Sequence, residues 1–327
     1  MTTEQFLQQW HDESPFVRVQ TSGSTGAPKP MLAEKRRMEA SARITCRFLG
    51  LQRGDTALLC LPLDYIAGKM MVVRALTCGL RLVSVEPSSH PLATLTEAVD
   101  FAAMVPLQVW NSLQTEEERR RLAAIGHLII GGGAIDDALA RELLTFPNAV
   151  WSTYGMTETL SHIALRRLNG PDASEWYTPF EGVSLDTDAD GCLVIDAPAV
   201  CGKRLRTNDL AELNDSGCFR ILGRKDNVVC SGGIKIQIEE VEQRLRPHLQ
   251  APFCISKRKD PVLGEALVLL TEEAATAHIQ ACCHEVLPRY WQPRHCISVS
   301  HIPLTATGKI ARKEAEQMAA QATPKRG

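Results

Sequence analysis

The residues best suited to chemistry stand in one short segment, TSGSTGAPKPM, from Thr21 to Met31. Its two glycines let a ligand approach the main chain, its hydroxyls and amides donate hydrogen bonds, and its lysine adds positive charge. This composition suits a phosphate chain. A Walker-type loop is a poor match, because Lys29 stands three residues after Gly26 and precedes a proline. Composition alone leaves an ordinary strand–helix turn open.

Strands and helices alternate around this segment. Residues 1–20 predict a short helix and then a strand, and residues 34–49 predict a helix. Further strands are expected at DTALLCLPL, LRLVSVE, HLII and NAVWSTYG, separated by helices at 66–79, TEEERRRLAAI and DDALARELL. Gly79 is the expected stop of the helix that precedes it. The alternation indicates an α/β fold with mostly parallel strands flanked by helices.

The pattern changes after residue 180. SLDTDADGCLVIDAP and AELNDSGCFRILGR carry turn signals between short strands, which predicts a β-rich subregion. The polar stretch GRKDNVVCSGG then precedes an amphipathic helix, IEEVEQRLRPHL, and a strand, EALVLL. We therefore expect a large N-terminal domain over residues 1–224 and a small α+β domain over residues 225–327.

The composition is that of an ordinary globular protein. Of 327 residues, 44% are hydrophobic, and 36 Lys and Arg against 38 Asp and Glu give a net charge of −2. Without a basic excess, a nucleic-acid partner is not expected. No apolar run approaches the roughly 18 residues that cross a bilayer, and the polar N-terminus is not a secretory signal. The 11 cysteines lack metal-ligand spacing, so a cytoplasmic protein with reduced thiols is expected.

Five segments resemble, in order, the signature motifs of the adenylate-forming enzymes, the superfamily of acyl-CoA synthetases, luciferases and peptide-synthetase adenylation domains. They are TSGSTGAPKP (21–30), STYGMTET (152–159), RTNDLAEL (206–213), GRKDNVVCSGGIKI (223–236) and PLTATGK (303–309). One motif is weak support, whereas five in register are specific. The resemblance implies ATP with Mg²⁺, a carboxylic acid that becomes an acyl-adenylate, and coenzyme A as the acceptor.

The resemblance also implies roles for individual residues. Catalysis is assigned to Lys309, Thr157 and Glu158, and Glu158 holds the metal, because a hard cation prefers carboxylate oxygen. The CoA thiol channel is assigned to Ser231, Gly232, Gly233 and Ile234, with a hinge at Asp226. ATP and AMP are assigned to Thr21, Ser22, Gly23, Ser24, Thr25, Gly26, Lys29, Gly131, Gly132, Gly133, Thr153, Tyr154, Gly155, Met156, Asp209 and Arg224.

Plainer alternatives stay open beside these roles. Tyr154 can pack in a core, Asp209 can belong to a turn, and Arg224 and Lys309 can be solvated surface charges. The role of Lys309 has a physical basis, because attack of a carboxylate on the α-phosphate brings two anions together and a lysine between them offsets the repulsion. The resemblance implies that the C-terminal domain rotates near Asp226 between adenylation and thioester formation.

The acid substrate is indicated by LPLDYIAGKMMVVRALTCG, residues 61–79. This run and SGGIKIQIEEVE resemble the o-succinylbenzoate–CoA ligases of menaquinone synthesis, in which an arginine at the position of Arg74 helps to hold a second carboxylate. A helix-surface arginine is the alternative. Tyr65 stands where most relatives have histidine, so its gate role is open. Lys69, Ser161 and His162 are further acid-site candidates, and His162 is assigned no proton transfer.

Other activities remain open at this point: another aryl- or acyl-CoA ligase, a stand-alone adenylation module that loads a carrier protein, or a non-catalytic binding protein. Most relatives carry a longer region before the phosphate loop than the 20 residues here, a trimming that short members of the o-succinylbenzoate group share. A removed layer would leave a face for a partner to cover, so a homo-oligomer is an expectation.

Overall fold

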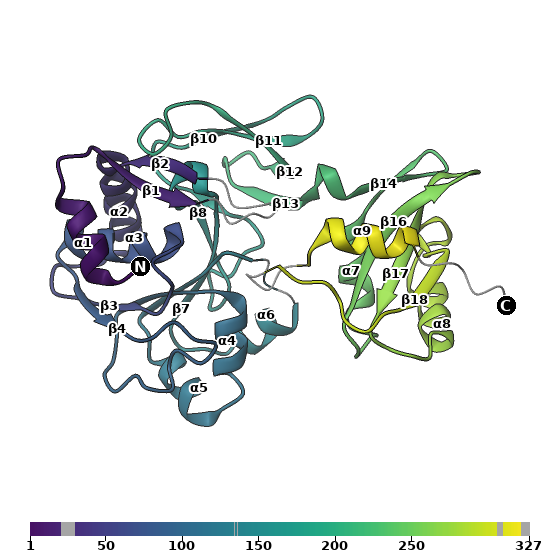
Figure 1. The fold of residues 1–327 in the computed structure, drawn as a ribbon, viewed down its shortest axis with the longest axis horizontal. Coiled ribbons are helices and arrows are strands. Elements are labelled where there is room, and N and C mark those ends of the chain that lie inside the picture. Colours follow the sequence, from purple (N-terminus) through teal and green to yellow (C-terminus); the bar gives the residue numbers. More distant parts are fainter. Residues whose placement is uncertain (21–29, 134, 136, 306–309, 322–327) are drawn as a thin grey trace. The chain divides into compact units, whose positions relative to one another are not determined.

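The computed structural model describes residues 1–20, 30–133, 135, 137–305 and 310–321 (Figure 1). Its helices are α1 (Thr3–His11), α2 (Lys35–Leu49), α3 (Ile66–Cys78), α4 (Pro106–Ser112), α5 (Glu116–Ala123), α6 (Asp137–Leu143), α7 (Ile238–Leu245), α8 (Ala277–Val286) and α9 (Arg312–Gln321). Short 3-10 helices are η1 (Thr157–Thr159), η2 (Lys225–Asn227) and η3 (Arg289–Trp291).

Four sheets are formed by the following strands. They are β1 (Phe16–Gln20), β2 (Pro30–Glu34), β3 (Thr56–Leu59), β4 (Arg81–Ser84), β5 (Phe101–Met104), β6 (His127–Ile130), β7 (Ala149–Gly155), β8 (His162–Arg167), β9 (Thr178–Pro179), β10 (Ser184–Thr187), β11 (Cys192–Asp196), β12 (Leu205–Leu213), β13 (Phe219–Arg224), β14 (Val228–Ser231), β15 (Ile234–Gln237), β16 (Phe253–Asp260), β17 (Gly264–Thr271) and β18 (His295–Ser298).

The chain divides into two compact units. The first comprises Met1–Asp186, Val194–Arg206 and Leu213–Arg220, and the second comprises Thr187–Leu193, Thr207–Glu212 and Ile221–Gly327. The predicted boundary after residue 224 stays a prediction. Among the helices of the described residues, none is long and apolar enough to cross a membrane.

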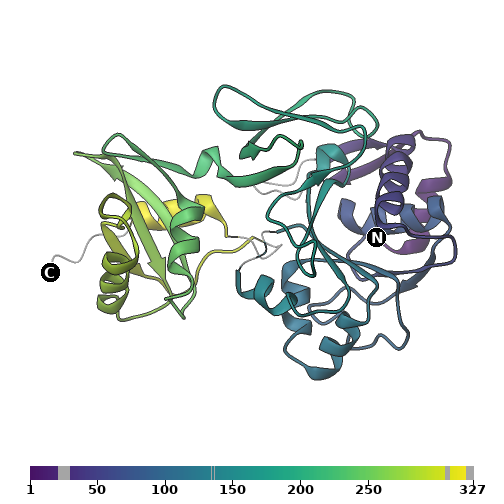
Figure 2. The ribbon, with the colours of Figure 1, turned by 180° about the vertical axis from the view of Figure 1, so that it is seen from behind.

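The large sheet of the first unit has the order β4-β3-β5-β6-β7-β8-β9. Its pairs from β4 to β7 are parallel and its last two pairs are antiparallel, which confirms the predicted α/β class. Every residue of β3 and β5 is buried, as expected of parallel strands covered on both faces. Figures 1 and 2 show α2 and α3 on one side of this sheet and α4 and α5 on the other.

The strand order reverses between β3 and β5. The chain leaves β3 through α3 to β4 on one side, and leaves β5 through α4 and α5 to β6 on the other. Open α/β sheets bind ligands at the carboxyl ends of their strands beside such a switch point. The segments that follow β3, β5, β6 and β7 are therefore where a site is expected.

Helix α3 is buried over most of its length. Gly68 through Ala75 are all buried, so this helix is enclosed rather than half exposed. Gly68 is required by close approach, because a Cβ atom there would lie 2.4 Å from the carbonyl oxygen of Pro62. The predicted stop is confirmed, since Gly79 caps α3 in the left-handed conformation with φ 70°.

The remaining sheets confirm the predicted change to a β-rich subregion after residue 180. Strands β10-β11-β12-β13 form the β-rich region expected after residue 180. In the second unit, β15-β14-β17-β16 pair in that order, and β18 adds to β17. One apolar cluster joins this sheet to α7 and α8, and another, with Ala315 and Ala319, joins it to α9.

Candidate active site

Predicted nucleotide residues of the first unit gather at the carboxyl edge of the large sheet. The turn Gly131–Gly133 follows β6 and lies beside the end of β7. A Cβ atom at Gly131 would lie 2.2 Å from Thr153 Oγ1, so a side chain does not fit there. Gly132 has φ 77°, which favours glycine. The structure thus brings Gly131 and Thr153 together with the main chain exposed between them.

The end of β7 turns back tightly into β8. A Cβ atom at Gly155 would lie 2.3 Å from the carbonyl oxygen of Ser161. The amide of Met156 donates to Thr159 Oγ1 at 3.0 Å, which closes the turn. Within it, Thr157 is buried and Glu158 is exposed, so the carboxylate is available to a ligand.

Leu160 ends this turn in an unusual conformation, with φ 66° and ψ −32°. Such angles are rare and strained for a residue with a Cβ atom. They direct the chain so that Ser161 and His162 come next at the start of β8. Strain of this kind is common at functional sites.

Tyr154 lies in an aromatic cluster that sequence reasoning missed. Its ring packs edge-on against Phe219 at 5.0 Å and against Tyr177 at 6.0 Å between centroids. Tyr177 also stacks on Phe219, and its hydroxyl lies 2.8 Å from Ser152 Oγ. An isolated β-bridge joins Tyr177 and Phe219. No local sequence signal indicates this long-range pairing.

Arg74 is the largest fully buried side chain among the described residues and is only 2% exposed. The surface alternative for Arg74 is therefore wrong. One terminal nitrogen donates to Ser161 Oγ at 2.7 Å and the other to Met71 Sδ at 3.6 Å. The guanidinium carbon lies 5.9 Å from the centre of the Phe101 ring. Burial lowers the pKa of Arg74 to about 10, so it stays charged at neutral pH.

This buried cation lacks a carboxylate partner among the described residues, where the Cys46 and Cys78 thiols are the acidic groups that act on it, and its Nε–H has no acceptor there. A buried charge without a counter-charge is costly, and proteins almost always pair one. Arg74 is thus a buried cation outside any ion pair with the described residues, and its contact with an acid stays a prediction.

A line of hydrogen bonds runs from Arg74 through Ser161 and His162. Ser161 Oγ lies 3.2 Å from His162 Nδ1, and His162 Nε2 lies 3.1 Å from Thr45 Oγ1 on α2. Burial, and then the charge of Arg74, hold the pKa of His162 well below its usual range. His162 is therefore a neutral, buried imidazole.

Tyr65 and Lys69 are the other two predicted acid-site residues. Tyr65 is half-buried and precedes the first turn of α3. Lys69 is buried, and its ammonium donates to the carbonyl oxygen of Leu63 at 2.5 Å and to that of Asp64 at 3.5 Å. Burial lowers the pKa of Lys69. These bonds tie down the segment after β3, and contact of either residue with an acid stays a prediction.

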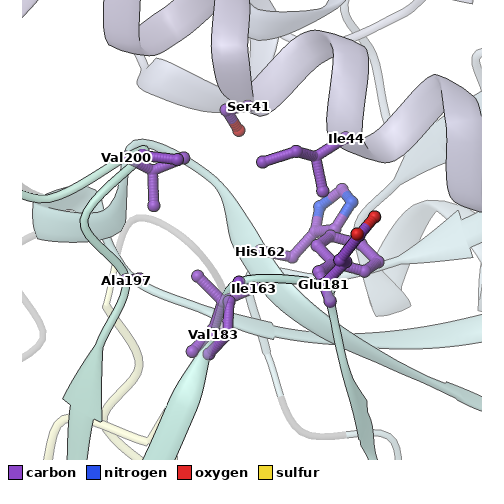
Figure 3. A pocket seen from close by; sticks show the side chains of 11 residues that line it. Ser41, Ile44, His162, Ile163, Glu181, Val183, Ala197 and Val200 are labelled. Atoms are coloured by element: carbon purple, nitrogen blue, oxygen red, sulfur yellow. The ribbon is translucent and has the colours of Figure 1, made fainter.

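A small pocket adjoins His162 on the α2 side (Figure 3). Its cavity volume is only about 10 Å³, room for about one water molecule. Apolar side chains such as Ile44, Ile163 and Val200 line most of it, and Ser41 projects from α2 above. Of the residues that line it, only His162 belongs to the predicted site, so this pocket is a neighbour of Arg74 and not the predicted nucleotide site.

The predicted ribose and hinge residues meet in the second unit. Arg224 at the end of β13 lies 3.6 Å from Asp209 Oδ1 on β12 and 3.4 Å from Asp226 Oδ2 in η2. Asn208 also donates to Asp226 at 3.0 Å. The structure thus brings Asp209, Arg224 and Asp226 together, although these residues come from two strands and a turn.

The predicted CoA-channel residues form the two-residue turn of a hairpin. Ser231 pairs with Ile234 where β14 meets β15, and the two glycines between them have φ 58° and φ 84°. Two positive φ values in succession are the requirement of a type I′ turn. Both glycines are exposed, so a stretch of bare main chain is presented to solvent.

The glycine-rich segment and the predicted catalytic lysine lie outside the described residues, namely Thr21, Ser22, Gly23, Ser24, Thr25, Gly26, Lys29 and Lys309. The ends of the lysine segment are described. Leu304 and Ile310 form a β-bridge, and the amide of Ala311 donates to the carbonyl oxygen of Pro303 at 2.8 Å. The chain that enters the segment therefore lies beside the chain that leaves it.

A resident metal cage is not found among the residues that the structure describes, where no group of three His, Cys, Asp or Glu side chains is suitably placed. Magnesium does not need such a cage, because it usually keeps several waters and binds through one or two carboxylates together with substrate phosphates. The single exposed carboxylate of Glu158 fits a magnesium ion held in that way.

Comparison with known proteins decides the family. Residues 4–186 match the model of the AMP-binding enzyme family. The chain belongs to the AMP-binding enzyme family. A crystal structure of an acyl-CoA synthetase (AMP-forming)/AMP-acid ligase II-like protein from Dyadobacter fermentans DSM 18053 is 35% identical, with a TM-score of 0.66, and the match covers 96% of this chain and 92% of that one.

Two further relatives extend the comparison. This AMP-binding enzyme is 25% identical to the 2-succinylbenzoate–CoA ligase of Bacillus thuringiensis subsp. konkukian (strain 97-27), over 92% of this chain and 69% of that protein. The o-succinylbenzoate coenzyme A synthetase of Bacillus subtilis, solved with ATP and magnesium, shares the fold at 22% identity and a TM-score of 0.75, over 91% and 69%. The chain is thus an acid–CoA ligase of the type that forms an acyl-adenylate.

Acidification from pH 7.5 to 5.5 is expected to lower the free energy of unfolding. Burial is the leading cause of the lowered pKa values of His127 and His162. In the unfolded chain both imidazoles bind protons near pH 6.5, so below that pH the unfolded state binds more protons than the folded state. Stability then falls by up to about 1.4 kcal/mol per pH unit for each histidine. Urea unfolding at stepped pH values measures this slope.

The variant His162→Gln separates the contribution of His162, because its amide cannot titrate in this range. Its stability should depend less steeply on pH than that of the wild type, whatever its absolute stability. His11→Gln, at an exposed position of α1, is the matched control. Equal slopes for wild type and His162→Gln would contradict the expectation.

Proposed function

We propose that this enzyme joins o-succinylbenzoate, an aromatic acid with two carboxylates, to coenzyme A at the expense of ATP. The single observation that supports the choice of a diacid is Arg74, a buried guanidinium that lacks a carboxylate partner among the described residues. One carboxylate of the substrate would pair with this cation while the other reacts. A fixed charge among apolar walls suits such an acid.

In the proposed first step, an oxygen of the reacting carboxylate attacks the α-phosphorus of ATP, and pyrophosphate leaves. The main chain of Gly131–Gly133 and the ring of Tyr154 would border the adenine, and Asp209 with Arg224 would bind the ribose. Thr157 and Glu158 would lie at the phosphates, where Glu158 would hold Mg²⁺, an ion that neutralises phosphate charge. Lys309 would stabilise the charge that develops between the two anions.

In the proposed second step, the thiolate of coenzyme A attacks the acyl carbon, and AMP leaves. The exposed turn Ser231–Ile234 would line the approach of the thiol, because its glycines leave the main chain bare. The C-terminal domain, residues 225–327, would pivot near Asp226 between the two steps, as in hinge-type alternation. Its contacts with Asn208 and Arg224 place Asp226 in a network that such a rotation would have to rearrange.

A pyrophosphate-release screen tests this function. Purified enzyme with ATP and Mg²⁺ is offered o-succinylbenzoate, benzoate, malonate and medium-chain fatty acids, each with and without coenzyme A. We expect pyrophosphate with o-succinylbenzoate in both arms, and a thioester detected by mass spectrometry only when CoA is present. Reactions without acid give the background.

Three other results would each revise the proposal. Release with a monoacid but not with o-succinylbenzoate would make the enzyme another acyl-CoA ligase. Adenylate without thioester on free CoA would favour a module that loads a carrier protein. No release with any acid would favour a binding protein without this activity.

A further inference from the structure

With a neutral His162, the hydrogen bonds beyond Arg74 have one consistent set of directions. Thr45 Oγ1 lies 3.1 Å from the carbonyl oxygen of Ser41, which can only accept, so the hydroxyl of Thr45 donates there. A hydroxyl carries one hydrogen, so Thr45 must accept from His162 Nε2 at 3.1 Å. His162 therefore carries its proton on Nε2.

The same reasoning continues to the guanidinium. A neutral imidazole with its proton on Nε2 leaves Nδ1 as an acceptor. The hydroxyl of Ser161 then donates to His162 Nδ1 at 3.2 Å, and its oxygen is left to accept from the terminal nitrogen of Arg74 at 2.7 Å. Each group in the line from Arg74 to Ser41 thus accepts from the one before it and donates to the one after it.

This line of hydrogen bonds orients the guanidinium of Arg74, which is otherwise held only weakly. Apart from Ser161, the guanidinium donates only to a thioether sulfur at 3.6 Å, a weak acceptor, among the residues described. Phe101 faces it at 5.9 Å and cannot set its rotation about the side-chain axis. The orientation of Arg74 therefore depends on Ser161, whose own hydrogen is held by His162, whose ring is in turn held by Thr45.

We propose that Thr45 and His162 are positioning residues that set the orientation of Arg74 through Ser161 and thereby the preference for a second carboxylate. Neither residue has to touch the substrate. The substrate readout of this inference rests on the proposed function. The inferred hydrogen-bond directions do not rest on the proposed function, because the position of the imidazole proton can be measured on the protein alone.

The first test reads that proton directly. The full chain is labelled with ¹⁵N-histidine, and long-range ¹H–¹⁵N correlation spectra distinguish protonated from unprotonated ring nitrogens. The His162 signals are those lost in His162→Gln. We expect a neutral ring with the proton on Nε2 at pH 7.5. A proton on Nδ1, or on both nitrogens, would overturn the inference whatever acid the enzyme uses.

The second test reads selectivity. Thr45→Val removes the hydroxyl but keeps the shape, so we expect KM for the diacid to rise about tenfold with kcat changed less than twofold, and KM for a monoacid to stay the same. Thr45→Ser should restore the wild-type value. Ser41→Ala is the matched control on the same helix, because the line uses the carbonyl of Ser41 and not its hydroxyl.

The outcomes separate the two ideas. Equal losses for diacid and monoacid, or a loss in kcat alone, would make Thr45 merely structural and would overturn the positioning role. If no diacid is a substrate, the proposed function fails, while the proton position still decides the arrangement of Thr45, His162 and Ser161. If diacids react and the proton lies on Nδ1, only the positioning role fails.

Discussion

Arg74→Leu is expected to raise KM for o-succinylbenzoate about 100-fold and to leave KM for benzoate within twofold. Removing one partner of a buried charge pair costs roughly 2–5 kcal/mol, and 100-fold corresponds to the lower part of that range. A monoacid has no second carboxylate to lose its partner. Steady-state kinetics with both acids measure the effect.

The same variant should be as stable as the wild type or more stable. In the absence of substrate, Arg74 is a buried charge without a carboxylate partner among the described residues, so an apolar side chain of similar size removes a desolvation cost. A loss of diacid affinity together with an unchanged or higher melting temperature would identify Arg74 as a residue kept for binding. Lower stability with equal losses for both acids would instead make it a packing residue.

Two further variants serve as controls for Arg74. Arg74→Lys keeps the charge but loses the planar fork, so its diacid KM should lie between those of wild type and Arg74→Leu. Arg119→Leu removes an arginine of the same unit that pairs with Glu142 at 2.9 Å and is well exposed. It should change neither KM.

Arg312→Ala is expected to lower the stability of the second unit by about 3 kcal/mol or more. Arg312 begins α9 and donates to both carboxylate oxygens of Glu242, at 2.6 and 2.8 Å, and to the carbonyl oxygen of Ile255 at 3.0 Å. Glu242 also accepts from the amide of Ile255 at 2.7 Å. Loss of the arginine would leave a buried carboxylate without its counter-charge.

Amide hydrogen exchange followed by mass spectrometry measures this effect in the full chain. Protection should fall over β16 and α9 while the large sheet keeps its protection. Arg244→Ala is the matched control, since Arg244 pairs with Glu240 on one exposed face of α7, and such pairs contribute little. Equal exchange in the Arg312 and Arg244 variants would contradict a stabilising role for the buried pair.

The sequence predicted most of the elements that carry strong local signals. Apolar strands at Thr56–Leu59 and His127–Ile130, and the helix that stops at Gly79, were confirmed because buried strands and a left-handed cap have clear residue requirements. β5 was missed because its sequence, FAAM, is too short to distinguish a strand from a helix by periodicity. The short helix α4, which follows β5, was missed as well.

The candidate site residues differ in the same way: some could be predicted from the sequence and others could not. Gly131 and Gly155 were selected from sequence through the family resemblance, and the structure adds that close approach leaves no room for a side chain there. The burial of Arg74 could not be predicted, since an arginine in an apolar helix can equally lie at the surface. Tyr177, Phe219 and Thr45 were missed because they reach the site through pairings distant in sequence.

The reversal of strand order between β3 and β5 has a consequence for how such an enzyme can diversify. Several candidate ligand contacts in the first unit come from a helix or turn that follows a strand, namely Arg74 on α3, the Gly131–Gly133 turn after β6, and Thr157 and Glu158 after β7. New specificities can therefore arise by exchanging the connecting segments one at a time. The turns after β6 and β7 are the segments most open to such exchanges, whereas α3 is part of the buried core.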